Sequence, residues 1–569
     1  MVLVGAIRDY VAKMLSELTG MKVLIVDKET LGFISVVFSQ SDILHKDVYL
    51  VEPVDAPPTE ESLGHLKAVC FLRPTGENIT QLKRHLKNPR YGEYHLFFSN
   101  ILKSTYIQIL ADADEHEVVR GVQEYFGDYF AIDPYHFTLN LPSNHLCMVP
   151  SVMDPHASQR AGDRIVEGLA SVFLSLKKRP VIRYQRSSEI ARRIASDVGK
   201  LMYEQESGLF DFRRGDNTPL LLVLDRRDDP VTPLLNQWTY QAMVHELIGL
   251  EDNRVDLGPP TGAKAKTEAQ QLVLSQEQDA FFKANMYENF GDLGANIKKM
   301  VDEFQAQSRS NQNLQTLQDM ARFVENYPEF RKKSGNVSKH VSLMSELSRI
   351  VDERILMSVS QIEQDLACTA SQATAFEEVS TQLDNEKVGD VDRLRLVLLY
   401  ALRYEKENPR QLEQLMTKLS SRPSKYKPAL VYTLLRHAGV EKRTGDLYMN
   451  RDFINRARNI ARGLKGVENV YTQHQPLLTQ TMENIAKGRL KDVDYPFVGS
   501  HYAPAGRPQD VVVFIVGGST YEESRAVALQ NNTASGVKFV LGGTVVHNSA
   551  SFLSDLEEVY RLERTSDLV

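Results

Sequence analysis

Cysteine, tryptophan and long apolar runs are all scarce in this chain. Its 569 residues include three cysteines, Cys70, Cys147 and Cys368, and one tryptophan, Trp238. The cysteines are far apart, odd in number and include no CxxC pair, so we predict no disulfide framework and expect reduced thiols in the cytosol. No window reaches the roughly 18 nearly uncharged apolar residues of a membrane span, so we expect that the chain does not cross a bilayer.

Charge of one sign is not in excess either. The 67 Lys and Arg residues against 74 Asp and Glu residues give a formal net charge of -7. This balance favours neither nucleic acid nor anionic lipid as a partner, so any membrane association should be indirect. The first 20 residues include Arg8, Asp9, Lys13 and Glu17, which indicates an amphipathic helix rather than a signal peptide. No heptad run forces dimerisation, so we expect a monomer.

Motifs for common enzyme chemistry are missing. The chain has no GxxxxGK[ST] phosphate loop, no HExxH zinc motif and no GxSxG nucleophile elbow. His136, His145 and Cys147 come closest to a metal cluster, but their spacing matches no zinc pattern. We therefore predict no metal and no other cofactor.

Two segments keep an alternative open, a nucleotide-dependent α/β enzyme. Gly517–Thr520 follows an apolar run, as phosphate-binding glycines do, but it lacks the lysine; we favour a tight turn before a helix capped by Ser519 or Thr520. Asp225–Pro230 follows a buried strand, where α/β enzymes often hold carboxylates. We favour a turn there too, with charged side chains that pair and cap the next helix.

The hydrophobic pattern predicts two α/β regions. The first 130 residues alternate β-rich apolar runs with helical stretches, the pattern of a parallel sheet covered by helices. A second α/β piece follows, and a βαβ pattern near the C-terminus has no core of its own, so we expect these two pieces to share one sheet. The expected strands are Lys22–Val26, Val48–Glu52, Ala68–Leu72, Tyr94–Phe98, Pro219–Leu224, Val511–Val516 and Val537–Leu541.

The chain is several times as long as an ordinary domain, so we expect more than one domain. A long helical insertion makes the third. Apolar residues recur at helical spacing from Met286 to Phe304 and from Val341 to Ile355, which predicts the two arms of a long helical hairpin. The polar stretch Ser308–Ser338, with Pro328, should hold its tip or a bend. The fold class is α/β plus mainly α, with domain one at 1–132, a discontinuous domain two at 133–249 and 486–569, and helical domain three at 250–485.

Four segments carry a family resemblance. Leu224–Leu235, LDRRDDPVTPLL, resembles the signature segment of the SM (Sec and Munc) proteins. KVLIVD at 22–27, PVIRY at 180–184 and RLRL at 393–396 stand in the order of that family. YTQHQPLL at 471–478 is similar to its endosomal, vacuolar-protein-sorting branch. The chain is identified as a member of the SM family over essentially its whole length.

The resemblance implies a three-domain arch that binds partners and performs no catalysis. SM proteins bind syntaxin-type Qa-SNAREs, often through an N-terminal peptide, and promote assembly of the four-helix SNARE bundle. The implied function is that of a SNARE-binding chaperone of vesicle fusion in trans-Golgi, endosomal and vacuolar protein transport. The implied partners are a Qa-SNARE and the assembling SNARE complex, without nucleic acid, and the implied location is cytoplasmic, peripheral to Golgi and endosomal membranes.

The resemblance also implies a peptide site on the outer face of domain one. In the family, the syntaxin peptide occupies an apolar pocket beside an acidic group, and the matching stretch here is Leu96–Glu115. The alternative is that these apolar side chains only pack their helix against the sheet. The matching residues are Phe98, Ile101, Leu102 and Leu110 for the pocket, and Glu115 with Asp112 or Asp114 for the acidic edge.

Two further surfaces follow from the resemblance. Some family members hold a closed syntaxin with basic residues on the cleft edge of domain one; Gly32 and Ser39 stand at those places here, whereas Glu52 matches. The sequence thus departs from that mode of binding. The family's helical hairpin templates SNARE helices, and the matching segment here is about 281–368. Its basic triplet Arg331–Lys333 could meet acidic SNARE surfaces or lipid headgroups. The alternative is an ordinary hairpin core with a solvated basic turn.

Overall fold

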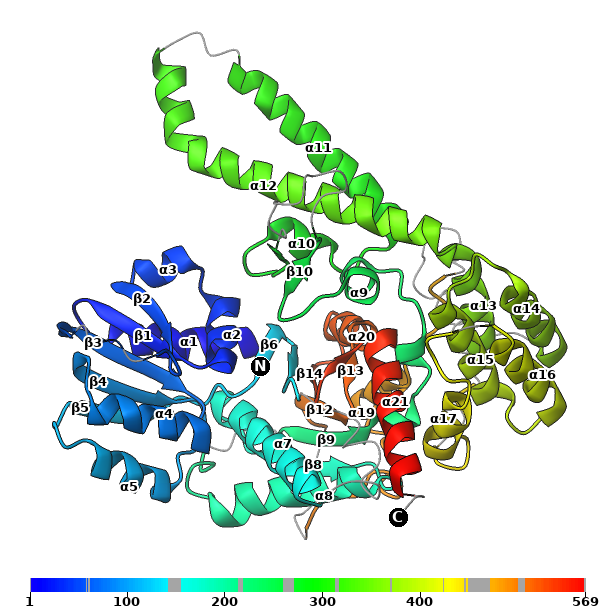
Figure 1. Ribbon diagram of the computed structural model, residues 1–569, viewed down its shortest axis with the longest axis horizontal. Coiled ribbons are helices and arrows are strands. Elements are labelled where there is room, and N and C mark those ends of the chain that lie inside the picture. The colour runs from blue at the N-terminus through cyan, green and yellow to red at the C-terminus, as the bar shows by residue number, and fades with distance from the viewer. Residues whose placement is uncertain are drawn as a thin grey trace. The chain divides into compact units, whose positions relative to one another are not determined.

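Figure 1 shows the computed structural model of the chain. The chain forms two compact units. One comprises Met1–Arg226, Leu478–Ser519 and Ala526–Val546, and the other comprises Arg227–Leu477, Thr520–Arg525 and His547–Val569. No helix among the described residues is long and apolar enough to span a bilayer. The structure describes residues 2–57, 59, 62–141, 155–212, 218–258, 271–312, 317–368, 371–422, 424–444, 447–448, 471–499 and 507–566.

The first unit is built from two sheets with helices against them (Figure 1). A π-helical turn, Leu201–Gln205, extends α8. The elements are α1 Leu3–Ser16, β1 Lys22–Val26, α2 Lys28–Val37, α3 Gln40–Leu44, β2 Val48–Pro53, β3 Leu63–Leu72, α4 Gly76–Lys87, β4 Tyr91–Phe98, α5 Ser104–Ala113, β5 Val119–Glu124, β6 Phe130–Asp133, β7 His136–Thr138, α7 Pro155–Ser175, β8 Val181–Tyr184, α8 Glu189–Lys200, β9 Leu220–Asp225, α19 Leu477–Ala486, β12 Asp510–Val516 and β14 Lys538–Gly543.

The first sheet has five parallel strands in the order β2-β1-β3-β4-β5. All four strands expected in this region are present, although β3 and β4 begin earlier than predicted, at Leu63 and Tyr91. Asp27 and Thr75 start α2 and α4, since each side chain accepts a hydrogen bond from the third backbone N–H of its helix. The interior strand β1 is buried throughout, whereas β2 and β5 are edge strands with largely exposed side chains.

The second sheet joins distant parts of the chain. Its order is β6-β7-β14-β12-β9-β8, and its neighbours are parallel except for the pair β6 and β7. Val513 of β12 lies opposite Leu222 of β9, so the C-terminal βαβ piece completes the sheet to which β6, β7, β8 and β9 belong. The prediction of one shared sheet is therefore confirmed.

The core of this second sheet also takes in α19. Leu478, Met482 and Ile485 pack against side chains of β9, β12 and β14. The predicted domain limits at residues 132 and 485 fall within β6 and α19. We propose that domain two includes both elements whole.

The second unit is mostly helical. Some elements have residues in both units: α19, β13 Ser519–Thr520, α20 Tyr521–Asn531 and β15 Val546–His547. The other elements are the 3-10 turn Thr232–Leu234, α9 Tyr240–Met243, the π-helical turn Val244–Ile248, β10 Arg254–Asp256, β11 Gln271–Val273, α10 Ala280–Asn285, α11 Phe290–Gln312, α12 Leu317–Glu353, α13 Leu356–Cys368, α14 Gln372–Asp384, α15 Asp390–Tyr404, α16 Pro409–Ser420, α17 Leu430–Ala438 and α21 Ser549–Ser566.

Helices α11 and α12 form a long hairpin (Figure 1). The hairpin proper spans 290–353 rather than 281–368, because α10 and α13 are separate helices. The connection between its arms falls inside the stretch predicted to hold the tip, but Pro328 lies within α12 and does not end it. Farther from the base, the rings of Phe304 and Phe330 stack with centroids 5.2 Å apart.

The buried stripe of α12 differs from the predicted one. Val341 was expected in the stripe but is 40% exposed, so that prediction is wrong. The buried side chains follow the spacing His340, Leu343, Leu347 and Val351. The buried stripe thus includes a polar residue, His340. A pattern of apolar residues alone does not include it.

Candidate partner-binding site

The apolar residues expected to form the peptide pocket lie at the end of β4, in α5 and in the loop between them. Phe98 ends β4, and with Leu102 and Leu110 it is buried in the core of the first sheet. Ile101 is half-buried. Phe98, Leu102 and Leu110 can therefore serve only as the floor of a surface site, which agrees with their alternative role in packing α5 against the sheet.

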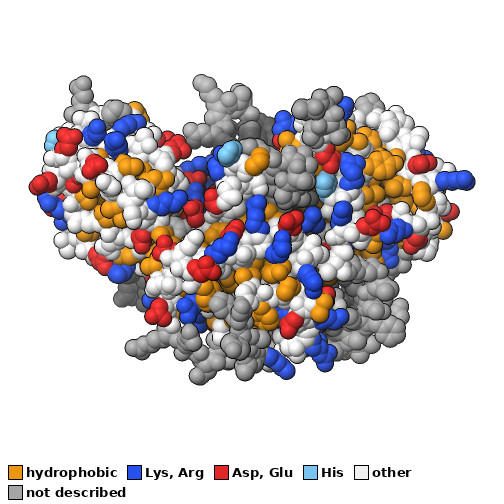
Figure 2. Space-filling view, turned by 90° about the horizontal axis from the view of Figure 1, so that it is seen from below, with side chains coloured by type: hydrophobic (Ala, Val, Ile, Leu, Met, Phe, Trp, Pro, Cys, Tyr) orange, Lys and Arg blue, Asp and Glu red, His pale blue; other side chains and the backbone are white. Residues whose placement is uncertain are grey.

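The exposed apolar side chains near these residues are different ones. Ile107 on α5 is 48% exposed, Ile109 is 38% exposed, and Val122 on β5 is 44% exposed. Sequence reasoning missed them. The available signal was that α5 carries more apolar residues than its single buried face, Leu110 and Ala113, requires. Figure 2 shows apolar side chains among charged ones on the face of the first unit where α5 lies.

The acidic residues of this region have separate roles. Asp112 and Glu115 are exposed at the end of α5. The Asp114 carboxylate accepts hydrogen bonds from the backbone N–H groups of residues 118 and 119 at 2.8 and 3.1 Å, so it shapes the turn into β5. Glu124 accepts a hydrogen bond from the Leu102 N–H at 2.7 Å and fixes the chain just before α5.

A buried carboxylate, Asp128, holds the loop that leads into α5. Arg73 donates to it at 2.7 Å, Asn100 donates through Nδ2 at 2.9 Å, and Arg164 of α7 approaches at 3.3 Å. Paired and hydrogen-bonded in this way, the charge can stay buried. The network ties the loops after β3 and β4 to α7, so the surface that α5 presents is set by a rigid base.

Glu52, the cleft-edge residue, is tied to the sheet. Its carboxylate accepts hydrogen bonds from Arg90 Nη1 at 2.8 Å and from the Tyr91 hydroxyl at 2.5 Å. Burial and the hydrogen bond to Glu52 raise the pKa of Tyr91 above its usual range. Gly32 lies in α2, and Ser39 caps α3. Glu52 therefore links β2 to the start of β4. Because its carboxylate is already paired with Arg90, little net charge remains there to attract a partner.

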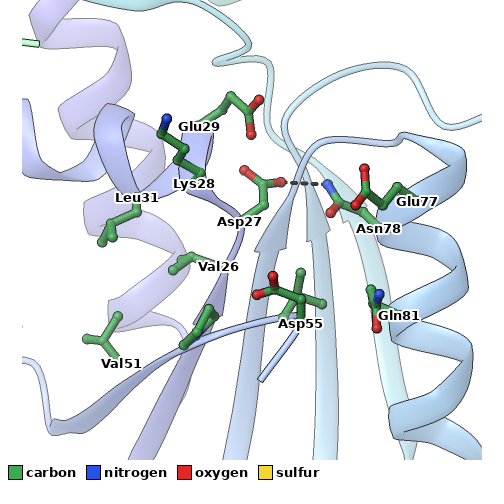
Figure 3. Close-up of a pocket in the computed structure, with 12 residues that line it drawn as sticks. Val26, Asp27, Lys28, Glu29, Leu31, Val51, Asp55, Glu77, Asn78 and Gln81 are labelled. Atoms are coloured by element: carbon green, nitrogen blue, oxygen red, sulfur yellow. Dashed lines mark hydrogen bonds between the residues drawn. The ribbon is translucent and has the colours of Figure 1, made fainter. Parts of the chain in front are cut away.

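A cavity of about 460 Å³ opens at the carboxyl end of β1 (Figure 3). The sheet order runs in opposite directions on the two sides of this strand, and such a point is where α/β folds commonly form crevices. The lining residues are Val26, Asp27, Lys28, Glu29, Leu31, Val51, Pro53, Val54, Asp55, Glu77, Asn78 and Gln81.

Asp27 is the one buried carboxylate of this cavity and is fully engaged by its surroundings. It accepts hydrogen bonds from the backbone N–H groups of Thr30 and Arg73 and from Asn78 Nδ2, at 2.7 to 2.8 Å. Burial raises the pKa of Asp27, and the hydrogen bonds from Thr30 and Arg73 oppose that shift. Its role is to brace α2 and α4, so the accessible charges of the cavity are those of the exposed side chains around it, Lys28, Glu29, Asp55 and Glu77.

In the second unit, Arg395 stands at the centre of a buried ionic network. Its guanidinium contacts Glu363 at 2.6 Å and Asp392 at 3.1 Å, and Arg354 contacts Asp392 at 2.7 Å. Burial raises the pKa of Glu363 to about 7, an effect that Arg395 opposes. The network joins α13, α15 and the end of α12, which explains why the RLRL segment at 393–396 has charges within a helix core.

The base of the hairpin is held by a second buried polar chain. Tyr240 Oη lies 2.7 Å from His340 Nδ1, and His340 Nε2 lies 2.9 Å from Asp279 Oδ2. Lys339 also pairs with Asp279. Burial alone would raise the pKa of Asp279, but hydrogen bonds from His340 and Lys339 hold it well below its usual range. This series of hydrogen bonds anchors α12 to α10.

The glycines at 517 and 518 serve a close backbone approach. Both have positive φ, and a Cβ on Gly517 would lie 2.7 Å from Arg226 Cβ. Arg226 Nε donates to Gly518 O at 3.0 Å. Thr520 caps the helix that follows, as expected, since its hydroxyl accepts from Glu523 N–H and the Glu523 carboxylate accepts from Thr520. These contacts favour the tight turn over a nucleotide site.

The carboxylates of Asp225–Pro230 make structural hydrogen bonds. Asp225 accepts from the Ser188 hydroxyl at 2.6 Å. In the second unit, Asp228 binds Thr444, and Asp229 caps the following 3-10 turn through the backbone N–H and hydroxyl of Thr232. This supports the turn and gives no arrangement of nucleophile and base.

No group of three or more His, Cys, Asp or Glu side chains is placed to hold a metal ion within the described ranges. His136 Nε2 lies 2.8 Å from the Ser519 hydroxyl. His145 and Cys147, considered with His136 from the sequence, lie outside the described residues.

The fold and its signature segments match known proteins. A model of the Sec1 family matches residues 22–555. The chain belongs to the Sec1 family. This family membership confirms the resemblance to SM proteins, and the similarity covers both units.

Individual relatives support the assignment at full length. The chain is 65% identical over 566 residues to the vacuolar protein sorting-associated protein 45 homolog of Arabidopsis thaliana, covering 99% of both chains. It is 46% identical over 557 residues to the human vacuolar protein sorting-associated protein 45, covering 97% of this chain and 95% of the relative. The chain is therefore similar to the vacuolar-protein-sorting branch of the Sec1 family.

Solved structures agree with these relatives. The SM protein Vps45 in complex with the Qa SNARE Tlg2 (1–310) superposes with a TM-score of 0.88 at 44% identity, over 99% of each chain. The Unc18 of the Unc18–syntaxin 1 complex from Monosiga brevicollis has a TM-score of 0.79 at 22% identity, over 98% of this chain and 100% of that one, and shows the shared Sec1-family fold.

Proposed function

We propose that this protein binds a Qa-SNARE and promotes SNARE-complex assembly for vesicle fusion in trans-Golgi, endosomal and vacuolar transport. The observation that carries this proposal is the likeness over 99% of the chain to an SM protein solved with a Qa SNARE. The activity is binding and templating, without a cofactor and without catalysis. The protein would reach Golgi and endosomal membranes through its SNARE partners.

The outer face of the first sheet is the proposed site for the N-terminal peptide of the Qa-SNARE. Phe98, Leu102 and Leu110 would form its floor, and the exposed side chains of Ile107 and Val122 would meet the peptide. Ile101, Asp112 and Glu115 lie at the margin, where the carboxylates can receive a basic residue of the peptide. Covering one large apolar side chain contributes about 1.5–3 kcal/mol, so a few anchors give measurable affinity.

Peptide titration tests this site. We expect N-terminal peptides of a trans-Golgi or endosomal Qa-SNARE to bind the full chain, measured by fluorescence anisotropy, with scrambled peptides as controls. Ile107→Arg should weaken binding at least tenfold without loss of folding, because the side chain is exposed. Leu529→Arg, at a 40% exposed position on α20, is the matched control. Equal affinities of both variants and wild type would place the peptide elsewhere.

The hairpin of α11 and α12 is the proposed template for SNARE helices. Its buried residues, such as Leu293 and Leu347, serve its own packing, so a SNARE helix would use the exposed sides. Arg331–Lys333 on α12 are exposed and offer positive charge to acidic SNARE helices. Charge reversal at these positions should slow SNARE assembly in a reconstituted fusion assay while peptide binding at α5 stays unchanged.

A further inference from the structure

A loop with an exposed apolar tip runs along the outer edge of the second sheet. It spans residues 487–497, directly after α19, and it is bound to the edge strand β8, where Tyr184 N–H donates to Pro496 O at 3.3 Å. Val493 in this loop is 68% exposed, the largest fraction among the large apolar side chains that the structure describes. One exposed valine is ordinary by itself, so its surroundings decide what it means.

The loop is held firmly, which fixes the position of Val493. Arg183 of β8 donates to Tyr495 O at 2.7 Å, and the Tyr495 side chain packs against the core of the second sheet. Arg186 donates from its backbone N–H to Asp494 O at 2.9 Å and from its guanidinium to Val493 O at 3.3 Å. Because the turn is already braced, a partner that covers the valine loses little entropy in ordering it.

The acidic side chains near this turn are largely neutralised. Asp492 pairs with Arg183 at 2.6 Å, and Glu483 near the end of α19 pairs with Lys487 at 3.3 Å. Asp494 is the other acidic residue of the loop and is half-buried. Negative charge therefore does little to repel an anion here.

Exposed cations without such a partner surround the turn. Arg507 lies just before β12, and its guanidinium donates to Ala486 O at 3.3 Å, directly ahead of the loop. Glu189 at the start of α8 pairs with Arg192 and so does not offset them. The exposed cations here that pair with no carboxylate of the described residues are Arg186, Arg489, Lys491 and Arg507. Positive charge is thus in local excess, although the whole chain has a formal net charge of -7.

An anionic membrane surface fits this combination of groups. Each Lys or Arg close to such a surface strengthens binding by about fivefold, and long basic side chains can reach the lipid phosphates. An apolar side chain between them can enter the boundary between headgroups and acyl chains. A folded protein would have to provide a pocket for the projecting Val493, whereas lipid adapts its shape to it. Figure 2 looks onto the side where α8 and β8 lie in Figure 1 and shows Lys and Arg side chains among apolar ones.

We propose that the 487–497 loop is a contact site for an anionic membrane surface. Val493 enters the boundary between headgroups and acyl chains, and the unpaired cations around it contact lipid phosphates. The contact is weak and reversible, because one valine and a few cations fall far short of a lipid anchor. It adds to recruitment by SNAREs, and it is separate from the peptide site at α5, since the loop borders the second sheet and α5 packs on the first.

Vesicle flotation tests the contribution of charge. We expect the full chain to float with phosphatidylcholine vesicles that contain about one-third phosphatidylserine but not with phosphatidylcholine alone, and the binding should fall steeply as salt is raised. Arg489→Glu/Lys491→Glu should weaken it at least tenfold. The matched control, Lys83→Glu/Lys87→Glu, makes the same charge change at exposed positions of α4 and should bind as wild type does.

Tryptophan emission tests the insertion of the tip. The native Trp238 is 4% exposed, so a tryptophan placed in the loop supplies the change of signal. The emission of Val493→Trp should shift to shorter wavelength when the anionic vesicles are added. That of Leu529→Trp, at a 40% exposed position of α20, should stay unchanged.

Three results would overturn the proposal: no flotation of wild type with the anionic vesicles, equal binding by both double variants, or no emission shift of Val493→Trp. A glutamate-rich peptide that binds wild type but not Arg489→Glu/Lys491→Glu, without vesicle binding, would also overturn it and make an acidic protein segment the occupant. None of these results bears on SNARE binding, because the vesicles carry no SNARE and the SNARE peptide is titrated separately.

Discussion

Replacing Arg395 with methionine should destabilise the second unit by roughly 3–5 kcal/mol, the usual cost of removing one partner from a buried ion pair. The guanidinium is fully buried and serves Glu363 and Asp392, and its Nε donates to Leu234 O at 2.8 Å. Arg354 still neutralises Asp392 in the variant, so the cost falls mainly on Glu363 and on Glu246, whose carboxylate lies 3.9 Å from Arg395.

Thermal melting measures this cost. At about 2–4 °C per kcal/mol for a unit of this size, the melting temperature should fall by roughly 6–20 °C. Arg349→Met is the matched control, because Arg349 makes its ion pairs with Glu346 and Glu353 on the surface of α12, where they contribute little. Adding Glu363→Gln to the Arg395 variant should restore part of the loss, since one stranded carboxylate is removed.

A fall of less than about 2 °C for Arg395→Met, or no recovery in the double variant, would refute the reasoning. The first result would mean that the cavity left by the guanidinium admits water and that the carboxylates are not stranded. The second would mean that Glu363 is not the group that bears the cost.

Three other changes have clear directions. Burial raises the pKa of Glu363 to about 7 from an ordinary 4.5, so the folded state keeps a proton that the unfolded state releases; stability should therefore fall as pH rises from about 5 through 7, and Glu363→Gln should flatten that part of the melting profile. Gly517→Ala should cost about 1–3 kcal/mol in melts, because φ is +96° and the new Cβ would meet Arg226. Gly335→Ala in α12, where the new Cβ meets nothing within 4 Å, should instead add up to about 1 kcal/mol; a loss there would contradict a regular helix through this position.

The strands and the shared second sheet could be predicted because apolar β-rich runs mark buried parallel strands whatever surrounds them. Lys22–Val26 is buried at every position, so its pattern is unambiguous. The C-terminal βαβ piece was assigned to the second sheet because it had too little apolar surface for a core of its own, and the pairing of β12 with β9 bears this out. The missed starts of β3 and β4 mix apolar with polar or glycine residues: Leu63 and Leu66 of β3 are partly buried, and Tyr91 of β4 is buried.

The peptide site and the stripe of α12 were harder to predict, for one physical reason. A short helix with apolar residues on several faces does not reveal which face the sheet covers. The sequence therefore indicates Leu110 for the peptide pocket, whereas in the structure Leu110 is buried and Ile107 is exposed. His340 likewise looks like a surface residue in the sequence, and only its hydrogen bonds to Tyr240 and Asp279 allow it to be buried. In both places the contacts that decide burial come from residues that are distant in sequence.

The two buried charge networks explain how a chain with discontinuous segments can present stable binding surfaces. Asp128 joins loops of the first sheet to α7, and Arg395 joins α13 and α15 to the turn at Leu234. A charge held in a protein interior tolerates little displacement, because each lost contact leaves an ion unpaired. The frame is therefore stiff where these segments meet, and it combines this stiffness with the exposed apolar side chains of α5. A protein that must hold flexible helices in register gains from this combination, since rigid surfaces lose less entropy when they bind.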